Sequence, residues 1–229
     1  MSFEQELSKY LPADLPERGR VITLSARHLD LIRQMNQVMN LTRIIDEKDA
    51  AIKHICDSVQ PWRLFAGQVS IVDAGTGAGF PGLPLAFAFP GIQFVLCESI
   101  QKKARFVSSA IEALGLSNVS VAPVRIEEWL RANPAPLVTA RAVASIPKMI
   151  DLLAPFIRKG TRLLLYKGPG VENEIAEAWN AAKVKRIQIT VAMRYELPEQ
   201  SGSRAIVELS GHYETVPDVA RRVLESNIV

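Results

Sequence analysis

The stretch SIVDAGTGAGFPG, residues 70–82, decides the fold of this chain. A short apolar run ends in Asp73, and glycines then follow at alternate positions up to Gly79, just before Phe80. This order predicts a strand that stops at an acid and turns sharply into a helix near Phe80. Glycines in such a turn adopt positive φ and let the backbone approach a ligand closely. At the carboxyl edge of a parallel sheet, a turn of this kind is where nucleotide-like cofactors bind.

Two classes of cofactor are compatible with the spacing of these glycines. Gly77, Gly79 and Gly82 form G-x-G-x-x-G, a weak signature of a dinucleotide whose pyrophosphate lies at a helix N-terminus. An acid at the strand end, Asp73, would repel a diphosphate and would suit the ammonium group of S-adenosylmethionine. Glu98 ends the next apolar run, about 20 residues past the glycines, where an acid accepts hydrogen bonds from the ribose of either cofactor.

Both acids also have a purely structural explanation. Asp73 could cap the turn or the helix that follows it, and Glu98 could be a solvated strand end. We favour cofactor binding, because the two acids close successive strand–helix units.

Length and composition indicate one large domain with room for a small appendage. The chain has 229 residues, a formal charge of +3 and a pI of about 8.9, which permits a nucleic-acid partner without requiring one. The two cysteines, Cys56 and Cys97, form neither a disulfide framework nor a metal site, and we expect no metal. The N-terminus lacks the pattern of a signal peptide, and no run is long enough to span a membrane. We therefore expect a cytoplasmic protein without a membrane partner.

The order of apolar patterns predicts a helical start followed by alternating strands and helices. A short helix is expected within residues 1–20, a second from the cap Ser25 to about Asn40, and a third over about 46–59. Strands are predicted near 68–73, 92–98, 118–124, 136–142, 161–167, 185–192 and 204–210. Helices are predicted near 81–89, 100–115, 126–131, 147–157 and 171–182. Only a loop, 194–203, joins the last two strands, so they should pair antiparallel.

This order of elements matches an α/β fold, that of the class I S-adenosylmethionine-dependent methyltransferases. Its sheet is Rossmann-like and seven-stranded, with the last strand antiparallel, and here it carries an N-terminal helical extension. We expect three regions: the extension at 1–60, the cofactor-binding domain at 61–210 and a tail at 211–229 with a terminal helix of no evident role.

Several short motifs match one protein family in order along the chain. They are N-L-T at 40–42, H-I-C-D-S at 54–58, G-F-P-G-L-P-L at 79–85, K-K-A-R-F at 102–106, A-R-A-V-A at 140–144 and Y-K-G at 166–168. Over roughly 35–210 the chain resembles the RsmG (GidB) family, whose members methylate N7 of a guanine in small-subunit (16S) ribosomal RNA with S-adenosylmethionine. The proline- and arginine-rich tail of many members is absent here.

The resemblance and the predicted strand ends together indicate candidate residues for the cofactor and substrate sites. For the cofactor these are Asp73, Gly75, Gly77, Gly79, Phe80, Glu98, Ile126, Glu127 and Arg141. For the substrate they are Lys102, Arg105 and Lys167. Glu127 is explained equally well as an acid favoured in the first turn of a helix, and Arg141 by an ion pair with Asp73 or Glu127. We expect His54 and Asp57 to form a structural hydrogen-bonded pair on one helical face.

The expected chemistry needs no general base, because N7 of guanine carries a lone pair and no proton. Arg141 is the remaining catalytic candidate. Alternatives are an NAD(P)-dependent oxidoreductase that uses Gly77, Gly79 and Gly82, a methyltransferase with another substrate, and a cofactor-binding regulator without catalysis. An oxidoreductase needs a proton donor, and none of the three histidines lies in the second half of the sheet. We expect a monomer that acts on small-subunit ribosomal RNA or on a ribosomal particle.

Overall fold

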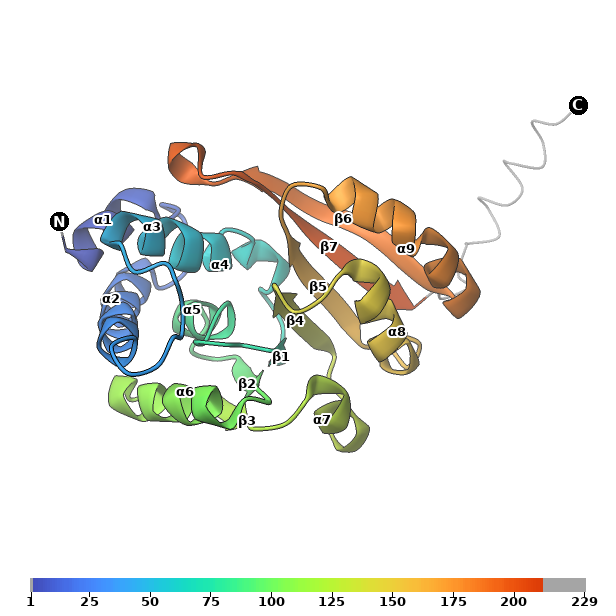
Figure 1. The fold of residues 1–229 in the computed structure, drawn as a ribbon, viewed down its shortest axis with the longest axis horizontal. Helices are drawn as coiled ribbons and strands as arrows, with labels where there is room; N and C mark the ends of the chain where they lie inside the picture. The colour runs from blue at the N-terminus through green and yellow to red at the C-terminus, as the bar shows by residue number, and fades with distance from the viewer. Residues whose placement is uncertain (1, 212–229) are drawn as a thin grey trace, which may run out of the picture.

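Seven strands form a single sheet in the order β3-β2-β1-β4-β5-β7-β6 (Figure 1). The computed structural model describes residues 2–211, so the predicted tail helix lies outside the described residues. The strands are β1 Ser70–Ala74, β2 Gln93–Cys97, β3 Val119–Ala122, β4 Leu137–Arg141, β5 Arg162–Lys167, β6 Ile187–Glu196 and β7 Ser203–Gly211. Strands β1 to β5 pair in parallel, and β7 pairs antiparallel with both β5 and β6. This topology confirms the predicted class I methyltransferase fold.

Helical segments precede the sheet and then alternate with its strands. Before the sheet lie α1 Phe3–Tyr10, α2 Arg18–Met35, α3 Glu47–Ala50, the π-helix η1 Ala51–Cys56, α4 Asp57–Val59 and the short η2 Trp62–Leu64. Between the strands along the chain come α5 Gly82–Ala88, α6 Gln101–Leu114, α7 Ile126–Ala132, α8 Ile146–Ile157, α9 Val171–Lys185 and the short η3 Pro198–Gln200.

The sheet divides the hydrophobic core into two parts, one on each face. Because successive side chains of a strand point to opposite faces, Ile71 of β1 belongs to the first part and Val72 to the second. Helices α1 to α6 cover the first face, where Leu7 and Ile55 of the N-terminal helices share one cluster with Phe87 of α5. Helices α7 to α9 cover the second face. The N-terminal helices are therefore packed onto the sheet rather than standing apart from it, and the boundary at residue 60 stays a prediction.

The predicted start of the second helix is wrong. Helix α2 begins at Arg18, and Ser25 is a buried residue within it rather than its cap. The apolar face that continues back to Val21 extends the helix, although no side chain caps its first turn. The helix also ends earlier than predicted, because the side chain of Asn36 binds the backbone of Leu41 and Thr42 and closes the next turn.

Candidate active site

The glycine-rich turn after β1 is closed by the carboxylate of Asp73. Its Oδ2 accepts hydrogen bonds from the Thr76 hydroxyl at 2.6 Å and from the Gly82 N–H at 2.9 Å. The Thr76 N–H donates to the carbonyl of Cys97 in β2 at 3.1 Å, which ties the turn to the neighbouring strand. Asp73 is fully buried, so the structure shows the capping role that we favoured less. Its contact with a cofactor stays a prediction.

Burial also changes the charge of Asp73. Loss of hydration raises the pKa of this carboxyl to about 7, although the hydrogen bonds from Thr76 and Gly82 act to lower the pKa. Its other oxygen, Oδ1, has no hydrogen-bond partner within residues 2–211. A carboxyl group that is partly protonated at neutral pH repels a diphosphate only weakly. The predicted repulsion by Asp73 is therefore a weak argument against a dinucleotide.

The backbone donors of the turn give a stronger argument against a dinucleotide. A pyrophosphate at a helix N-terminus is held by amides that have no other partner. Here the amides of Gly79 and Phe80 both donate to the Thr76 carbonyl at 2.9 Å, and that of Leu83 donates to the Gly79 carbonyl at 2.8 Å. The Gly82 amide is taken by Asp73. These groups are engaged within the turn, which favours a cofactor without phosphates.

Glu98 directly follows β2 and is a buried carboxylate beside the turn. Its Oε2 accepts from the Gly77 N–H at 2.9 Å and its Oε1 from the Ile100 N–H at 2.8 Å. Each carboxylate oxygen can accept a further hydrogen bond. The position therefore suits a ligand with adjacent hydroxyls. Beyond β3, at the start of α7, Ile126 is buried and Glu127 is half-buried.

The loop after β4 lies directly against the glycine-rich turn. Gly75 is exposed and has φ +65°, and a Cβ atom placed on it would come within 2.8 Å of Val143 Cγ2. Ala142, next to Val143, has φ 57°, a conformation that is costly for a residue with a side chain. Such backbone strain occurs often at functional sites.

The N-terminal helices hold the turn from the other side through two histidines. The ring of Phe80 lies 4.6 Å from that of His54, nearly parallel, and 5.1 Å from that of His28. Burial lowers the pKa of His28 to about 4 and that of His54 to about 3. His28 is therefore neutral, and its Nε2 donates to the Ala78 carbonyl at 2.9 Å. The sequence analysis gave His28 no such role, and contact between Phe80 and a cofactor stays a prediction.

Arg141, at the end of β4, pairs with Asp57 rather than with Asp73 or Glu127. Its Nη1 donates to Asp57 Oδ2 at 3.0 Å and to the carbonyls of Lys53 and His54 at 3.1 and 3.3 Å. Both carbonyls belong to the π-helix η1, a geometry often found at functional sites. The predicted ion-pair partners were wrong because this partner comes from a helix far away in the sequence.

Asp57 is the centre of a buried polar network. Its Oδ1 accepts from the Tyr195 hydroxyl at 2.9 Å and lies 3.5 Å from Arg204 Nε. The predicted pair of His54 and Asp57 does not form, since His54 Nε2 contacts the Thr42 hydroxyl instead. The network joins the N-terminal helices to β4, β6 and β7, and the sequence analysis missed Tyr195 and Arg204.

A charged hollow of about 660 Å³ opens beside this network, at the carboxyl ends of β4 and β5. Its ionic lining consists of the cations Lys53, Arg141, Lys167 and Arg204 and the acids Asp57 and Glu174. The formal excess is thus two positive charges. Val143 also lines the hollow, so the hollow adjoins the turn that Val143 touches.

The structure brings one of the three predicted substrate residues into this hollow. Lys167 donates to the Ala144 carbonyl and to Glu174 Oε2, both at 2.7 Å. Lys102 and Arg105 lie instead on the exposed side of α6, without an ion-pair partner in the described part of the chain. Contacts of all three with substrate stay predictions.

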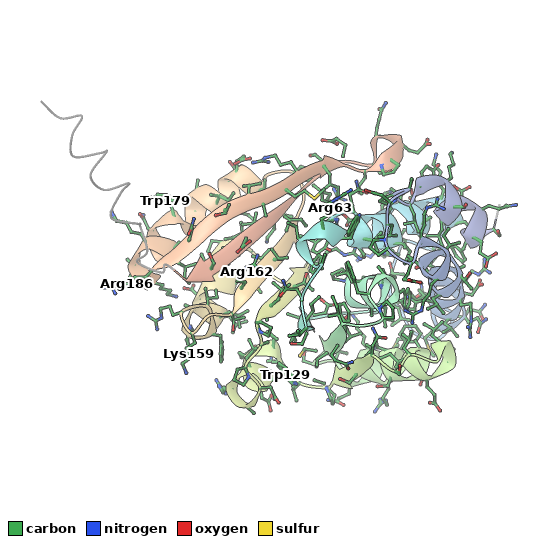
Figure 2. The ribbon with its side chains drawn as sticks, turned by 180° about the vertical axis from the view of Figure 1, so that it is seen from behind. Arg63, Trp129, Lys159, Arg162, Trp179 and Arg186 are labelled. Carbon is green, nitrogen blue, oxygen red and sulfur yellow. The ribbon has the colours of Figure 1, made fainter. Side chains whose placement is uncertain are left out.

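A second hollow lies at the opposite edge of the sheet. It measures about 350 Å³ and is lined by Trp179 of α9 and by Ile187, the first residue of β6. Figure 2 shows Trp179 on α9. Ligands of such sheets bind outside the carboxyl ends of the strands, and this hollow lies at the amino end of β6. Within residues 2–211 no cluster of side chains could hold a metal ion, and no helix is long and apolar enough to cross a membrane.

Comparison of the sequence with known proteins identifies one family of methyltransferases. The sequence model of one family, rRNA small subunit methyltransferase G (GidB), matches residues 22–201. A ribosomal RNA small subunit methyltransferase G from Solibacter usitatus is 56% identical over 209 residues, which cover 91% of this chain and 100% of that protein. The protein of the same name from Geobacillus kaustophilus is 33% identical and covers 84% of this chain and 86% of its own length.

Solved structures share the fold at low sequence identity. A SAM-dependent O-methyltransferase from Thermotoga maritima superposes with a TM-score of 0.52 at 17% identity, over 80% of this chain and 71% of that chain. A precorrin-6y C5,15-methyltransferase from Geobacter metallireducens gives a TM-score of 0.52 at 13% identity, over 68% of this chain and 87% of that chain. Both support the class I fold.

Proposed function

Because the chain belongs to the rRNA small subunit methyltransferase G family, we propose that it transfers a methyl group from S-adenosylmethionine to N7 of a guanine in small-subunit (16S) ribosomal RNA. The observation that carries this proposal is the glycine-rich turn: its Gly79, Phe80 and Gly82 amides are engaged within the turn, and the Glu98 carboxylate lies beside it on the Gly77 amide. This arrangement suits a cofactor that has ribose hydroxyls and no phosphates. S-adenosylmethionine has both properties.

The cofactor residues have separate tasks in this proposal. Glu98 accepts from the ribose hydroxyls, and the exposed backbone of Gly75 lets the cofactor approach the sheet closely. Ile126 and Glu127, the first residues of α7 after β3, border the adenine. When bound, S-adenosylmethionine supplies an electrophilic methyl group.

The chain then has to align the guanine rather than deprotonate it. N7 has an in-plane lone pair and no proton, so no side chain needs to act as a general base. Alignment of two reactants is worth up to roughly 7–11 kcal/mol in favourable cases. We assign this task to the charged hollow, whose excess of positive charge suits an RNA strand.

We place the reaction in the cytoplasm and assign it to a monomer that acts on small-subunit RNA or on a ribosomal particle. RNA binding that depends on phosphate contacts weakens as salt rises. Because the basic surface is modest, free RNA should bind less well than a structured particle.

Deletion of the gene tests the proposal most directly. Borohydride–aniline cleavage of ribosomal RNA maps 7-methylguanosine, and one site in the small-subunit RNA should disappear from the deletion strain. The purified protein with S-adenosylmethionine should restore it. Persistence of every such site would refute the guanine-N7 assignment.

Calorimetry tests the cofactor site separately. Glu98→Ala should weaken S-adenosylmethionine binding by about 1–3 kcal/mol, the cost of a lost hydrogen bond to a charged group. Glu128→Ala, which removes an exposed acid of α7, is the matched control and should bind normally.

A further inference from the structure

One hydrogen-bond acceptor of the charged hollow is not engaged by the protein. The two acids of the lining differ in this respect. Asp57 is 5% exposed and uses both oxygens, toward Arg141, Tyr195 and Arg204. Glu174 is 33% exposed, and only its Oε2 is engaged, by the Ile146 N–H at 2.8 Å and by Lys167 at 2.7 Å. Within residues 2–211 its Oε1 makes no hydrogen bond.

The contacts on Oε2 fix the side chain of Glu174 in place and keep it charged. The Ile146 amide belongs to the first turn of α8, and Lys167 ends β5, so two rigid elements hold the carboxylate. Burial acts to raise the pKa of Glu174, but the hydrogen bonds from Lys167 and Ile146 outweigh it and hold the pKa below its ordinary value. A fixed, ionised carboxylate with one unengaged oxygen therefore lines the hollow.

The proposed reaction determines which edge of a guanine in the hollow stays free for a contact with Glu174. The N7 edge must face the glycine-rich turn, where the methyl group arrives. The opposite edge carries the N1–H and the N2 amino group, which are both hydrogen-bond donors. Adenine presents an unprotonated N1 in the same place, which a carboxylate would repel.

We propose that Glu174 recognises the target base as a guanine, by accepting hydrogen bonds from its N1–H and N2 amino group in the charged hollow. This inference rests on the proposed function and adds the residue that selects the base. The carboxylate has a second effect, because methylation of N7 gives the base a positive charge that a nearby anion stabilises. Glu174 thus serves both specificity and rate.

The test compares guanosine with inosine at the mapped target position of the RNA substrate. Inosine keeps N7 and N1–H but lacks the N2 amino group. The wild-type protein should methylate guanosine with a kcat/KM roughly 10- to 100-fold above that for inosine, the range for loss of one hydrogen bond to a charged group. In Glu174→Gln, the side-chain carbonyl can keep the contacts with Ile146 and Lys167, and an amide NH2 then faces the base. This variant should lose most of the preference as well as guanosine activity.

Two further variants keep the test specific. Glu172→Gln alters an exposed acid in the same turn of α9 and should keep the wild-type preference. Glu174→Asp keeps the charge but withdraws it by one methylene, and it should lower the preference without abolishing activity. S-adenosylmethionine binding, measured by calorimetry, should be unchanged in all of them, which also reports that they fold.

The outcomes separate this inference from the function on which it rests. If Glu174→Gln lowers the rates on guanosine and inosine equally, or leaves both unchanged, the assignment of Glu174 is overturned while the proposed function stands. If the wild-type protein methylates no guanosine, the proposed function fails and this inference fails with it. A lost preference with intact cofactor binding supports both.

Discussion

The cofactor turn, residues 73–82 with Glu98, and the charged hollow beside it differ in the sequence separation of the residues that form them. Hydrogen bonds in the turn join Asp73 to Gly82, nine positions apart, and Gly77 to Glu98, 21 positions apart. In the network that borders the hollow, Arg141 and Asp57 are 84 positions apart, and Tyr195 and Asp57 are 138 apart. A short motif can therefore encode the first part, whereas the second exists only when distant segments meet. Four substitutions test this difference.

Removal of Asp57 should have the largest effect. Asp57→Ala leaves the Arg141 and Arg204 guanidinium groups without their shared carboxylate, and loss of one partner of a buried ion pair costs about 3–5 kcal/mol. Urea unfolding measures this loss. The control is Asp49→Ala, which breaks an i,i+4 pair with Lys53 on the surface and should cost about 0.3–0.5 kcal/mol. Equal costs for the two variants would mean that the network does not hold the segments around the hollow together.

Substitution of Asp73 should change the pH dependence of stability. The pKa of its carboxyl is about 7 in the folded protein against an ordinary 3.8. Between these values the folded state keeps a proton that the unfolded state has lost, so Asp73 lowers the free energy of unfolding as pH rises from about 4 to about 7. Asp73→Asn cannot ionise. Its free energy of unfolding should therefore rise relative to that of the native protein as pH increases, by up to roughly 1.4 kcal/mol per pH unit in this window.

Urea titrations of both proteins from pH 4 to pH 8 measure this effect. The difference between their unfolding free energies isolates Asp73 from the buried histidines, which titrate in both. A difference that does not vary between pH 4 and pH 7 contradicts the buried, proton-binding carboxyl.

Overpacking of the turn should have a smaller effect on stability. A Cβ atom on Gly82 would lie 2.8 Å from Asp73 Oδ2 and would also collide with Leu96. Gly82→Ala should therefore cost about 1–3 kcal/mol, measured as a shift of the urea midpoint. Gly91 is the control, because a Cβ atom on it would meet nothing within 4 Å, and Gly91→Ala should leave the midpoint nearly unchanged. A tolerated Gly82→Ala would show that the turn can widen.

The smallest effect on stability is expected at Lys53, although it lines the hollow. Its ammonium pairs with Asp49 at 3.0 Å on a half-exposed surface, so Lys53→Ala should cost about 0.3–0.5 kcal/mol. If Lys53 contacts an RNA phosphate, the slope of log affinity against log salt should fall by about one. An unchanged slope places the RNA backbone elsewhere.

The sequence predicted the parts of the molecule that depend on neighbouring residues. The apolar runs marked the strands because parallel strands are buried on both faces, and the glycines with Asp73 located the turn. Ser25 was misjudged because a preferred cap residue can also lie inside a helix when tertiary packing continues its apolar face, here back to Val21.

The polar network was beyond sequence analysis for a physical reason. The partner of Arg141 is chosen by which helix packs over β4, and neither a period nor a spacing in the chain specifies that contact. Tyr195 was missed because the sequence analysis ended the sixth strand at 192 and placed this residue in the loop 194–203, whereas β6 continues to Glu196. The HICDS segment that includes Asp57 was recognised as a motif, but the partners of Asp57 can be identified only in the folded structure.

The dependence of Asp57 on Tyr195 and Arg204 also has a consequence for synthesis of the chain. A ribosome adds about 5–20 residues per second, so the 138 positions between Asp57 and Tyr195 take roughly 7–28 s to translate. Throughout that interval the N-terminal helices have left the ribosome without the strands that complete their polar contacts. A nascent chain therefore acquires its hollow only when β6 and β7 emerge, and truncated products that end before Tyr195 lack it.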